Sequence, residues 1–492
     1  MESEVNRVSP HLFPVEFGRS QARVGIVHLG LGNFHRAHQA VYTQAALQAD
    51  DRWGICGVSL RSAGVVRELR AQGMRYTLLE RSPTGVTPYT ISAIRDALRG
   101  DRDMDAIVAR ISAPATRIVT LTVTEKGYCQ VPATGRLDAG HADIVHDLGD
   151  ASAPRSAPGV LLRGLHLRMA HGAPLTVVCC DNLPHNGATV RAITLELAAL
   201  IDPALGRWIE TSVAFPSTMV DRIVPATTDA DREAVRTLGL HDAVPVATEP
   251  FTQWVIEDRF AAERPRWEDG GAQFVADVGP FEMMKLRLLN GAHSAMAYLG
   301  YLAGYEFVDQ VAADPSFRRM VERLWAELAP TLPPTPGIDI ADYQRMLMLR
   351  FQNSALSHRT WQIAMDGSQK LPQRLVAAAS ERQARGEGVD TIALAIAAWM
   401  RYATGADEQG RAIDVRDPLQ PEFARIARRS ADDPAALARG MLGLEQVFGP
   451  LGANAHFADN VTRKLRQLFS MGAKRVVARD AEVAGLVPAM PA

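Results

Sequence analysis

Cysteine is scarce in this sequence, and long hydrophobic runs are missing from it. Four cysteines in 492 residues are too few for a disulfide framework, and the neighbours Cys179 and Cys180 should point to opposite faces of a strand. Free thiols suit a reducing compartment, so we expect a cytoplasmic protein. The chain opens without a basic segment followed by an apolar run, and no window of about 18 uncharged apolar residues occurs later. The sequence therefore predicts neither an export signal nor a membrane span.

An excess of one charge sign is also missing. The 53 basic and 55 acidic side chains give a formal net charge of −2. The chain therefore has no excess of positive charge that would attract nucleic acid or an anionic membrane. A small-molecule substrate is the expected partner, and the protein is expected to be a monomer or a small homo-oligomer. The hydrophobic fraction of 47 % is ordinary for a globular protein, and this length favours two domains.

The first half of the chain alternates short apolar runs with helical patterns. The runs are rich in Val, Ile and Thr and mostly continuously apolar, as strands buried on both faces should be. They are Arg23–Gly30, Gly54–Leu60, Arg117–Thr124 and Leu175–Asn182. Helices are expected between them, at Arg36–Leu47 and Val160–Met169 among others. This alternation predicts an α/β domain over residues 1–279, built on a doubly wound parallel sheet.

The hydrophobic pattern of the sequence changes near Gly279. Strand patterns become rare after this residue, and helical patterns follow. A mostly α-helical second domain is therefore expected over residues 280–492. Its predicted helices include Phe317–Leu328, Tyr343–Phe351, Ile392–Tyr402 and Ala435–Phe448.

A glycine pair follows the first predicted strand, at Gly30 and Gly32. Glycine there would let the backbone turn tightly and approach a pyrophosphate, at the positive end of the following helix. A plain tight turn is the alternative, since His35 occupies the place of the third glycine of the usual fingerprint. Gly57–Gly64, which spans the end of the second strand, has no acid to bind a ribose, and Arg61 there could meet a 2′-phosphate or be solvated. NAD is the expected cofactor, and NADP is not excluded.

Three histidines near this loop could be mistaken for a metal site. His28, His35 and His38 span a strand end and a helix start, without a recognised zinc spacing or a nearby cysteine pair. We expect them to be structural or to support the cofactor loop, and we predict no metal.

The apolar segment Phe281–Gly300 carries Lys285, Asn290 and His293. In a continuous α-helix, His293 and Asn290 lie about 80° and about 140° around the axis from Lys285, so the three can border one cleft. Burial and the positive end of the helix would both lower the pKa of the lysine, whereas Glu282 one turn earlier would raise it. The alternative is an interdomain salt bridge beside a satisfied core histidine.

Carbonyl reduction by a nicotinamide cofactor needs such groups. A positioned acid or base must move a proton at the oxygen while hydride is transferred at carbon. Lys285 could do this without metal, and the amides of Asn182 and Asn290 could stabilise the developing alkoxide. For Asn182 the alternative is a turn residue that caps the helix near Asn186.

The chain resembles the mannitol dehydrogenase family, the polyol-specific long-chain dehydrogenases, in five ordered segments: "GLGNFHRAHQ", "TVTEKGYC", "DNLPHNG", "FPSTMVDRIVP" and "KLRLLNGAH". The resemblance implies a Rossmann-type N-terminal domain, a helical C-terminal domain and metal-independent chemistry. It implies Lys285 as general acid/base, Asn182 and Asn290 as the oxyanion hole, and Glu282 in proton relay to the lysine. His293 and Asp221 become substrate-binding groups. The cofactor-binding segments contain Gly30, Gly32, Asn33, Phe34 and Glu125.

Within that family, three segments resemble the fructuronate reductase branch, which acts on D-fructuronate and D-mannonate. They are Gly271–Ser294, Arg359–Leu375 and Asp407–Pro418. "DNLPHNG" is closer to the mannitol 2-dehydrogenase branch, although Gln362 stands where that branch has an arginine. A uronate carries a carboxylate that cationic donors would recognise, and Lys370, Arg374 and Arg359 are the candidates. A polyol dehydrogenase, a non-catalytic nucleotide sensor and a zinc-dependent enzyme are the alternatives.

Overall fold

The computed structural model describes residues 23–131, 134–431 and 433–485, and the chain divides into two compact units. The N-terminal unit comprises Met1–Gly279 and the C-terminal unit Pro280–Ala492. Among the described residues, no helix combines the length and hydrophobicity that crossing a bilayer requires.

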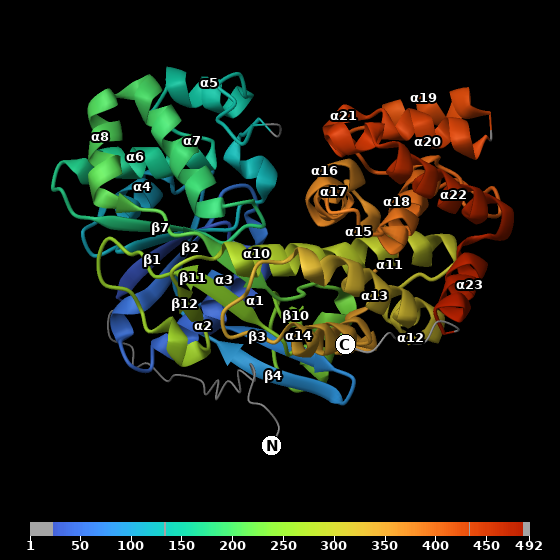
Figure 1. Ribbon diagram of the computed structural model, residues 1–492. Helices are drawn as coiled ribbons and strands as arrows, with labels where there is room; N and C mark the ends of the chain where they lie inside the picture. The colour runs from blue at the N-terminus through green and yellow to red at the C-terminus, as the bar shows by residue number, and fades with distance from the viewer. Residues whose placement is uncertain (1–22, 132–133, 432, 486–492) are drawn as a thin grey trace. The chain divides into compact units, whose positions relative to one another are not determined.

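A six-stranded parallel sheet forms the centre of the N-terminal unit (Figure 1). Its strands lie in the order β5-β2-β1-β6-β7-β8, and every neighbouring pair is parallel. The bounds are β1 Val24–Leu29, β2 Gly54–Ser59, β5 Ile94–Arg99, β6 Ile118–Leu121, β7 Leu175–Cys179 and β8 Val213–Ala214. Counted along the chain, this order is 3-2-1-4-5-6, that of the Rossmann fold, whose strand order reverses between β1 and β6. The four predicted strands and the predicted fold class are confirmed.

Alternate residues of each strand enter two different cores. On β1, Val27 and Leu29 join one core and Ile26 joins the other. The first core includes side chains of α4 Met104–Ser112, α6 Ala157–Met169, α7 Asn186–Ile201 and α8 Pro203–Ser212, and the second those of α2 Gln39–Ala46 and α3 Gly64–Ala71. Figure 1 shows these two groups of helices on opposite faces of the sheet. Cys179 and Cys180 likewise enter different cores, and all four cysteines are free and buried.

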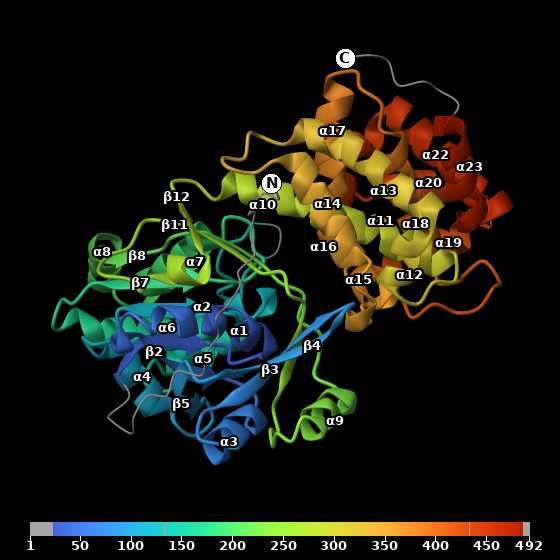
Figure 2. The ribbon, with the colours of Figure 1, turned by 90° about the horizontal axis from the view of Figure 1, so that it is seen from below.

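Two small sheets were not expected from the sequence. A hairpin of β3 Tyr76–Ser82 and β4 Gly85–Ile91 (Figure 2) is extended by β10 Val246–Thr248, and β11 Gln253–Glu257 lies between β9 Thr218–Asp221 and β12 Gln273–Val275. These strands are short or exposed on one face, so they lack the continuous apolar runs that mark the central sheet.

The predicted helix Arg36–Leu47 is two helices, α1 Asn33–Ala37 and α2, which is a correction. His38 breaks the helix with φ −127° and ψ −89°. Its Nε2 lies 2.9 Å from the carbonyl oxygen of Gln253, so the buried ring is held by β11 rather than by helical packing. The two other helices of this unit are α5 Ala142–Gly149 and α9 Asp229–Thr237.

The C-terminal unit is helical in its described residues, and α11, α13, α18 and α22 pack together at its centre (Figure 2). Its helices are α10 Gly279–Met284, α11 Gly291–Leu302, α12 Val308–Ala313, α13 Pro315–Leu328, α14 Ile340–Phe351, α15 Thr360–Ala364, α16 Gly367–Leu371, α17 Ala377–Ala384, α18 Asp390–Ala403, α19 Gln420–Ser430, α20 Pro434–Leu442, α21 Glu445–Phe448, α22 Ala455–Met471 and α23 Ala473–Gly485. Three predicted helices are confirmed in α13, α14 and α18. The predicted helix Ala435–Phe448 is instead divided into α20 and α21, because Gly443 ends the first and Leu444 is not helical.

Arg168 fastens the amino-terminal edge of the central sheet. Its side chain is fully buried, and its guanidinium donates five hydrogen bonds of 2.7 to 3.1 Å to backbone carbonyls. The acceptors are Ile111, Ala113, Thr116, Ala173 and Pro174, in the segments that lead into β6 and β7. Burial lowers the pKa of Arg168 to about 10, so the group remains charged at neutral pH. One side chain therefore satisfies the carbonyls of two strand-leading segments.

Arg168→Lys should destabilise the N-terminal unit, because lysine cannot reach five acceptors in the geometry of the guanidinium fork. Carbonyls left unsatisfied in the core cost about 1–3 kcal/mol each, so we expect a loss of about 3 kcal/mol or more. Arg207→Lys, at an exposed position of α8, is the matched control. Urea unfolding and hydrogen exchange at β6 and β7 would measure the effect. If the two variants have the same urea unfolding midpoint and the same hydrogen-exchange rates at β6 and β7, Arg168 does not stabilise the sheet in this way.

Candidate active site

The glycine loop lies where the strand order reverses, after β1 and beside the end of β6. Gly30 has φ +107°, and a Cβ there would come within 2.1 Å of the carbonyl oxygen of Thr122. Gly32 differs, because its φ of −99° and ψ of −174° suit any residue and its Cβ would meet only the Gly30 oxygen at 3.8 Å. The chain itself demands glycine at 30, whereas at 32 it leaves open space. That space beside the reversal point fits the backbone approach to a dinucleotide pyrophosphate.

His28 holds this loop against β6. Its Nδ1 is 2.8 Å from Thr120 Oγ1, and its Nε2 is 3.0 Å from the Gly30 carbonyl oxygen and 2.9 Å from Thr122 Oγ1. The His35 ring stacks on it with 3.4 Å between centroids. Burial lowers the pKa of His28 to about 3, so the imidazole is neutral. These contacts agree with the structural role expected for the histidines.

The other predicted cofactor residues lie around the same edge of the sheet. Asn33 donates to Thr227 Oγ1 over 3.0 Å, and Phe34 stacks on the His38 ring with centroids 5.0 Å apart. Arg61 and Glu125 follow β2 and β6; both are exposed, and Arg61 lies 3.9 Å from a carboxylate oxygen of Asp143. Their cofactor roles stay predictions. The helix after the loop, α1, has only five residues, so its dipole is smaller than the long predicted helix implied.

Asn182 follows β7, and Asp221 ends β9. Asp221 is buried and Asn182 is exposed. The residue at the N-cap position of α7 is His185, with φ 45° and no side-chain cap, and both interpretations of Asn182 stay predictions. The Asn186 amide ties β7 to β9 by donating to the Asp181 and Thr218 carbonyls, at 3.1 and 2.9 Å.

The helix that carries Lys285 and Asn290 is not a continuous α-helix. Residues Lys285–Asn290 form a π-helical segment between α10 and α11, and the Gly291 N–H bonds the Leu286 carbonyl five residues back. The angle of about 140° expected between Lys285 and Asn290 is therefore wrong. Because the turn is one residue wider, residues five apart share one face, much as residues four apart do in an α-helix. Lys285 is 8 % exposed, and Glu282, one turn earlier, is partly exposed.

His293 is buried without a hydrogen bond at Nε2 in the described part of the chain. Its ring packs between Phe351 and His358, with centroids at 4.8 and 5.4 Å. Burial and then the neighbouring His358 lower the pKa of His293 far below its usual value. A satisfied core histidine is thus not what the structure shows: the ring is neutral, and one nitrogen remains for an external partner.

Three cationic side chains contribute to the low pKa of this histidine. Arg350, Arg374 and Lys285 all act electrostatically on His293, and Lys370 acts on His358, whose pKa burial lowers to about 4. Arg350 and His358 were missed by the sequence analysis. A signal for Arg350 exists: it shares the buried stripe of α14 with Tyr343, Leu347 and Phe351, where an arginine is unusual.

The predicted substrate-binding cations have distinct surroundings. Lys370 Nζ donates to the Met365 carbonyl over 2.6 Å. Arg374 Nη1 donates to Ser294 Oγ over 3.1 Å and to the Asn290 carbonyl over 3.4 Å. Arg359 forms an ion pair with Glu306, and both side chains are more than half exposed, at 54 % and 55 %. Their substrate contacts stay predictions, and the local contacts of Arg359 are those of a surface residue.

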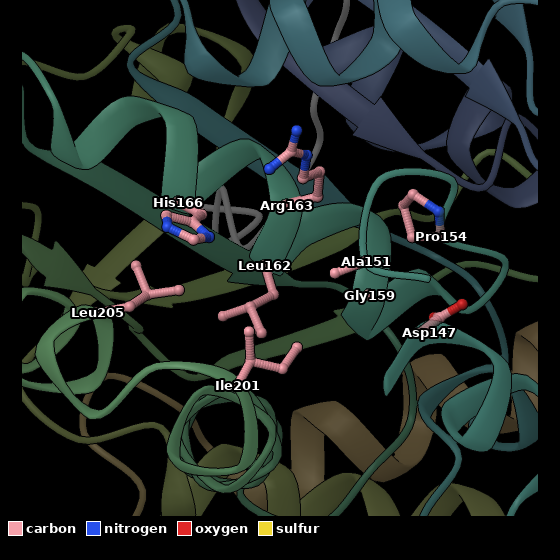
Figure 3. Close-up of a pocket in the computed structure, with 9 residues that line it drawn as sticks. All are labelled: Asp147, Ala151, Pro154, Gly159, Leu162, Arg163, His166, Ile201 and Leu205. Atoms are coloured by element: carbon pink, nitrogen blue, oxygen red, sulfur yellow. The ribbon is translucent and has the colours of Figure 1, made fainter. Parts of the chain in front are cut away.

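A surface pocket elsewhere in the N-terminal unit does not belong to this set (Figure 3). Arg163 and His166 of α6 line it together with Ile201 and Leu205. Ile201 ends the sixteen-residue helix α7, about 20 Å along the axis from the β7 end where Asn182 lies. None of the predicted site residues lines this pocket.

One group of possible metal ligands occurs in the described residues, namely Cys129, His141 and Asp143. His141 Nδ1 accepts the Asp143 backbone N–H over 3.2 Å at the start of α5. A ring that accepts at Nδ1 carries its proton on Nε2, so neither nitrogen is left to bind a metal. This arrangement favours a helix cap.

Comparison with known proteins agrees with this fold. The Mannitol dehydrogenase Rossmann domain matches residues 24–269, and the Mannitol dehydrogenase C-terminal domain matches residues 277–469. The chain therefore belongs to the mannitol dehydrogenase family, and it is an oxidoreductase that acts on CH–OH groups with a nicotinamide cofactor.

Three relatives span almost the whole chain. The D-mannonate oxidoreductase of Escherichia coli K12 is 46% identical, covering 92% of this chain and 95% of its own. An uncharacterized oxidoreductase, YeiQ, of the same organism is 44% identical, covering 95% and 96%. A solved Pseudomonas fluorescens mannitol 2-dehydrogenase, in a ternary complex with NAD and D-mannitol, is 38% identical with a TM-score of 0.84, covering 95% and 96%. The NAD in that structure confirms the cofactor class expected from the sequence.

Gly32→Ala should weaken NADH binding without unfolding the protein. The added methyl group fits the chain, as the 3.8 Å contact shows, but it would fill the space proposed for the pyrophosphate. We expect the NADH Kd to rise at least about tenfold, measured by fluorescence titration, with an almost unchanged melting temperature. Gly30→Ala is the comparison and should lower the melting temperature, because of the clash with Thr122. If Gly32→Ala binds NADH with wild-type affinity, the glycine loop is not part of the cofactor site.

Proposed function

We propose that this protein interconverts D-fructuronate and D-mannonate with NAD(H), and that Lys285 is the general acid/base. The observation that carries the choice of a sugar acid is the cationic setting of His293, with Arg350, Arg374 and Lys285 acting on it. A substrate with a carboxylate would be recognised by charge-assisted hydrogen bonds there. The 46% identity to a D-mannonate oxidoreductase supports the same choice.

The chemistry divides into a hydride step and a proton step. NADH, when bound, supplies the hydride to the carbonyl carbon. The Lys285 ammonium gives a proton to the carbonyl oxygen as that carbon is reduced, which produces the alcohol, and the reverse transfer applies to oxidation. Asn290 shares a face of the helix with Lys285, so its amide can donate to the same oxygen, and Asn182 is proposed as the second donor.

Proton exchange with solvent is assigned to Glu282. Lys285 is buried, whereas Glu282 is partly exposed one turn earlier. A carboxyl group in that place can take up a proton from solvent and pass it to the neutral amine after each reduction. His293 is neutral and can bind a substrate hydroxyl through Nε2. Asp221 is proposed as a further hydroxyl-binding group.

Lys370 and Arg374, with Arg359, remain the proposed contacts to the carboxylate. Lys370 is partly buried, and its charge acts on His358, which lies beside His293. Of the three residues, Arg359 has the least support as a substrate contact, because its side chain is exposed and forms an ion pair with Glu306.

A second candidate function is the interconversion of D-fructose and D-mannitol. The solved relative with NAD and D-mannitol, at a TM-score of 0.84, favours it. A nucleotide sensor would need none of Lys285, Asn290 and His293, so the set argues for catalysis. For the cell we propose a cytoplasmic enzyme whose partners are NAD and a small sugar acid or polyol, working as a monomer or small homo-oligomer.

Lys285→Ala should lower the catalytic rate by several orders of magnitude and leave the NADH Kd nearly unchanged, because only the proton step is removed. Steady-state turnover and an NADH titration on the same preparation would measure both quantities. Asn290→Ala and Asn182→Ala should each cost roughly 10²-fold in rate, as expected for an oxyanion donor. A Lys285→Ala enzyme with a third of the wild-type rate would remove the lysine from the mechanism.

The catalytic efficiency should be at least about tenfold higher on D-fructuronate than on D-fructose, since one charge-assisted contact contributes roughly 1.5–3 kcal/mol. Both substrates should be measured at the same pH and NADH concentration. Equal or better efficiency on D-fructose would overturn the uronate proposal and favour the second candidate function, the interconversion of D-fructose and D-mannitol. Tight NADH binding without turnover of either substrate would favour the sensor.

A further inference from the structure

The π-helical segment Lys285–Asn290 is tied to its neighbours by side chains from outside the helix. A π-helical turn is rare and is found mostly as an insertion in an α-helix, often at a functional site. Arg287, inside the segment, is 4 % exposed. Its Nη1 donates to Glu381 Oε2 over 2.8 Å and to the Thr331 carbonyl over 2.6 Å. The segment is thus anchored at its middle to α17 and to the loop after α13.

A second contact comes from α13. Trp325 is buried, and its indole Nε1–H donates to the carbonyl oxygen of Leu288 over 2.9 Å. Leu288 lies between Lys285 and Asn290, so the bond fixes the carbonyl at the centre of the wide turn. The rest of the Trp325 ring packs in the core, stacked on Phe351 with centroids 6.3 Å apart. The N–H of Trp325 makes the hydrogen bond to the wide turn, whereas its apolar ring contributes to the packing of the core.

The third contact comes from another π-helical segment, Pro372–Val376, which packs against the first. Arg374 in that segment donates to the Asn290 carbonyl over 3.4 Å and to Ser294 Oγ over 3.1 Å. The two backbones approach closely at Gly291, where a Cβ would lie 3.3 Å from the Arg374 carbonyl oxygen. The guanidinium therefore spans the point where the wide turn returns to the α-helix.

We propose that Trp325 and Arg374 are positioning residues that hold the wide turn, and so keep Lys285 and Asn290 on one face of the helix. This inference rests on the proposed roles of Lys285 and Asn290 in catalysis. For Arg374 it replaces a direct contact with the substrate by a contact with the backbone of a catalytic residue. Small displacements of such groups are costly, since about 1 Å can change a rate by about 10².

Trp325→Phe tests the first anchor because it removes the N–H and keeps an aromatic ring. We expect kcat to fall about tenfold, the midpoint of the pH profile of kcat to move, and the NADH Kd to stay within about twofold of wild type. Trp267→Phe is the matched control: it removes another buried indole bond, 3.0 Å to Thr43 Oγ1, in the other unit. The control should leave kcat and the pH profile unchanged. Trp325→Phe with wild-type kcat and pH profile would overturn the proposal.

Arg374→Met and Arg374→Lys test the second anchor and separate two roles. A positioning role predicts that Arg374→Met lowers kcat about tenfold with little change in KM for the sugar substrate, and that Arg374→Lys restores much of the rate. A substrate-carboxylate role predicts the opposite split, with a raised KM on D-fructuronate and no effect on D-fructose. That second pattern would overturn the proposal for Arg374.

Both anchors are tested on whichever substrate the wild-type enzyme turns over. Failure of the proposed function would appear in the wild type and in Lys285→Ala, whereas failure of the positioning role would appear only in the anchor variants. Circular dichroism and thermal unfolding of each variant identify a simple loss of folding. If Trp325→Phe melts far below wild type, Arg374→Lys against Arg374→Met still decides the question, because those two variants are compared with each other.

Discussion

The hydrogen bonds of one buried histidine fix the place where the N-terminal unit can receive a ligand. His28 joins β1, the Gly30 carbonyl and the two threonines of the β6 end, Thr120 and Thr122. These are the two strands between which the order of the sheet reverses. Because the ring is neutral at any physiological pH, with a pKa of about 3, this support does not change with pH. The position of the glycine loop, and with it the space at Gly32, follows from that junction.

In the C-terminal unit, the candidate site combines neutral imidazole nitrogens with basic side chains. The imidazoles of His293 and His358 are neutral because burial and neighbouring cations lower their pKa values. Arg350 and Lys370 are basic side chains whose charges act on these two imidazoles. A sugar acid needs both kinds of group, since its hydroxyls are bound by neutral donors and acceptors while its carboxylate is bound by cations.

Much of this organisation could be predicted from the sequence. The central strands were visible because they are buried on both faces, and the helices α13 and α14 because their apolar residues recur at the helical period. The small sheets were not visible, since β4 is exposed over most of its length and β9 and β12 are very short. The break at His38 could not be foreseen, because it depends on a carbonyl of β11 more than 200 residues away in the chain.

Prediction of the candidate site from the sequence was limited in the same way, by contacts between residues far apart in the chain. Lys285, Asn290 and His293 could be identified by type and spacing, but their mutual angle could not, because spacing was converted to angle with the α-helical period. The π-helical turn is held by Trp325 and Arg374, which lie 37 and 84 residues from the carbonyls that they contact. Arg350 was not predicted, although it lies on the buried stripe of α14, where an arginine is unusual.

The widened turn also marks the place where this helix carries one residue more than a continuous α-helix would. A π-helical turn contains one residue more than the α-helical turn that it replaces. Loss of a single residue between Lys285 and Asn290 would restore a continuous α-helix, in which a residue four positions after the lysine lies only about 40° from it around the axis. The later side chains, His293 included, would therefore keep nearly the same face of the helix. The effect of such a deletion would fall on the wide turn itself and on the carbonyls that Trp325 and Arg374 contact there.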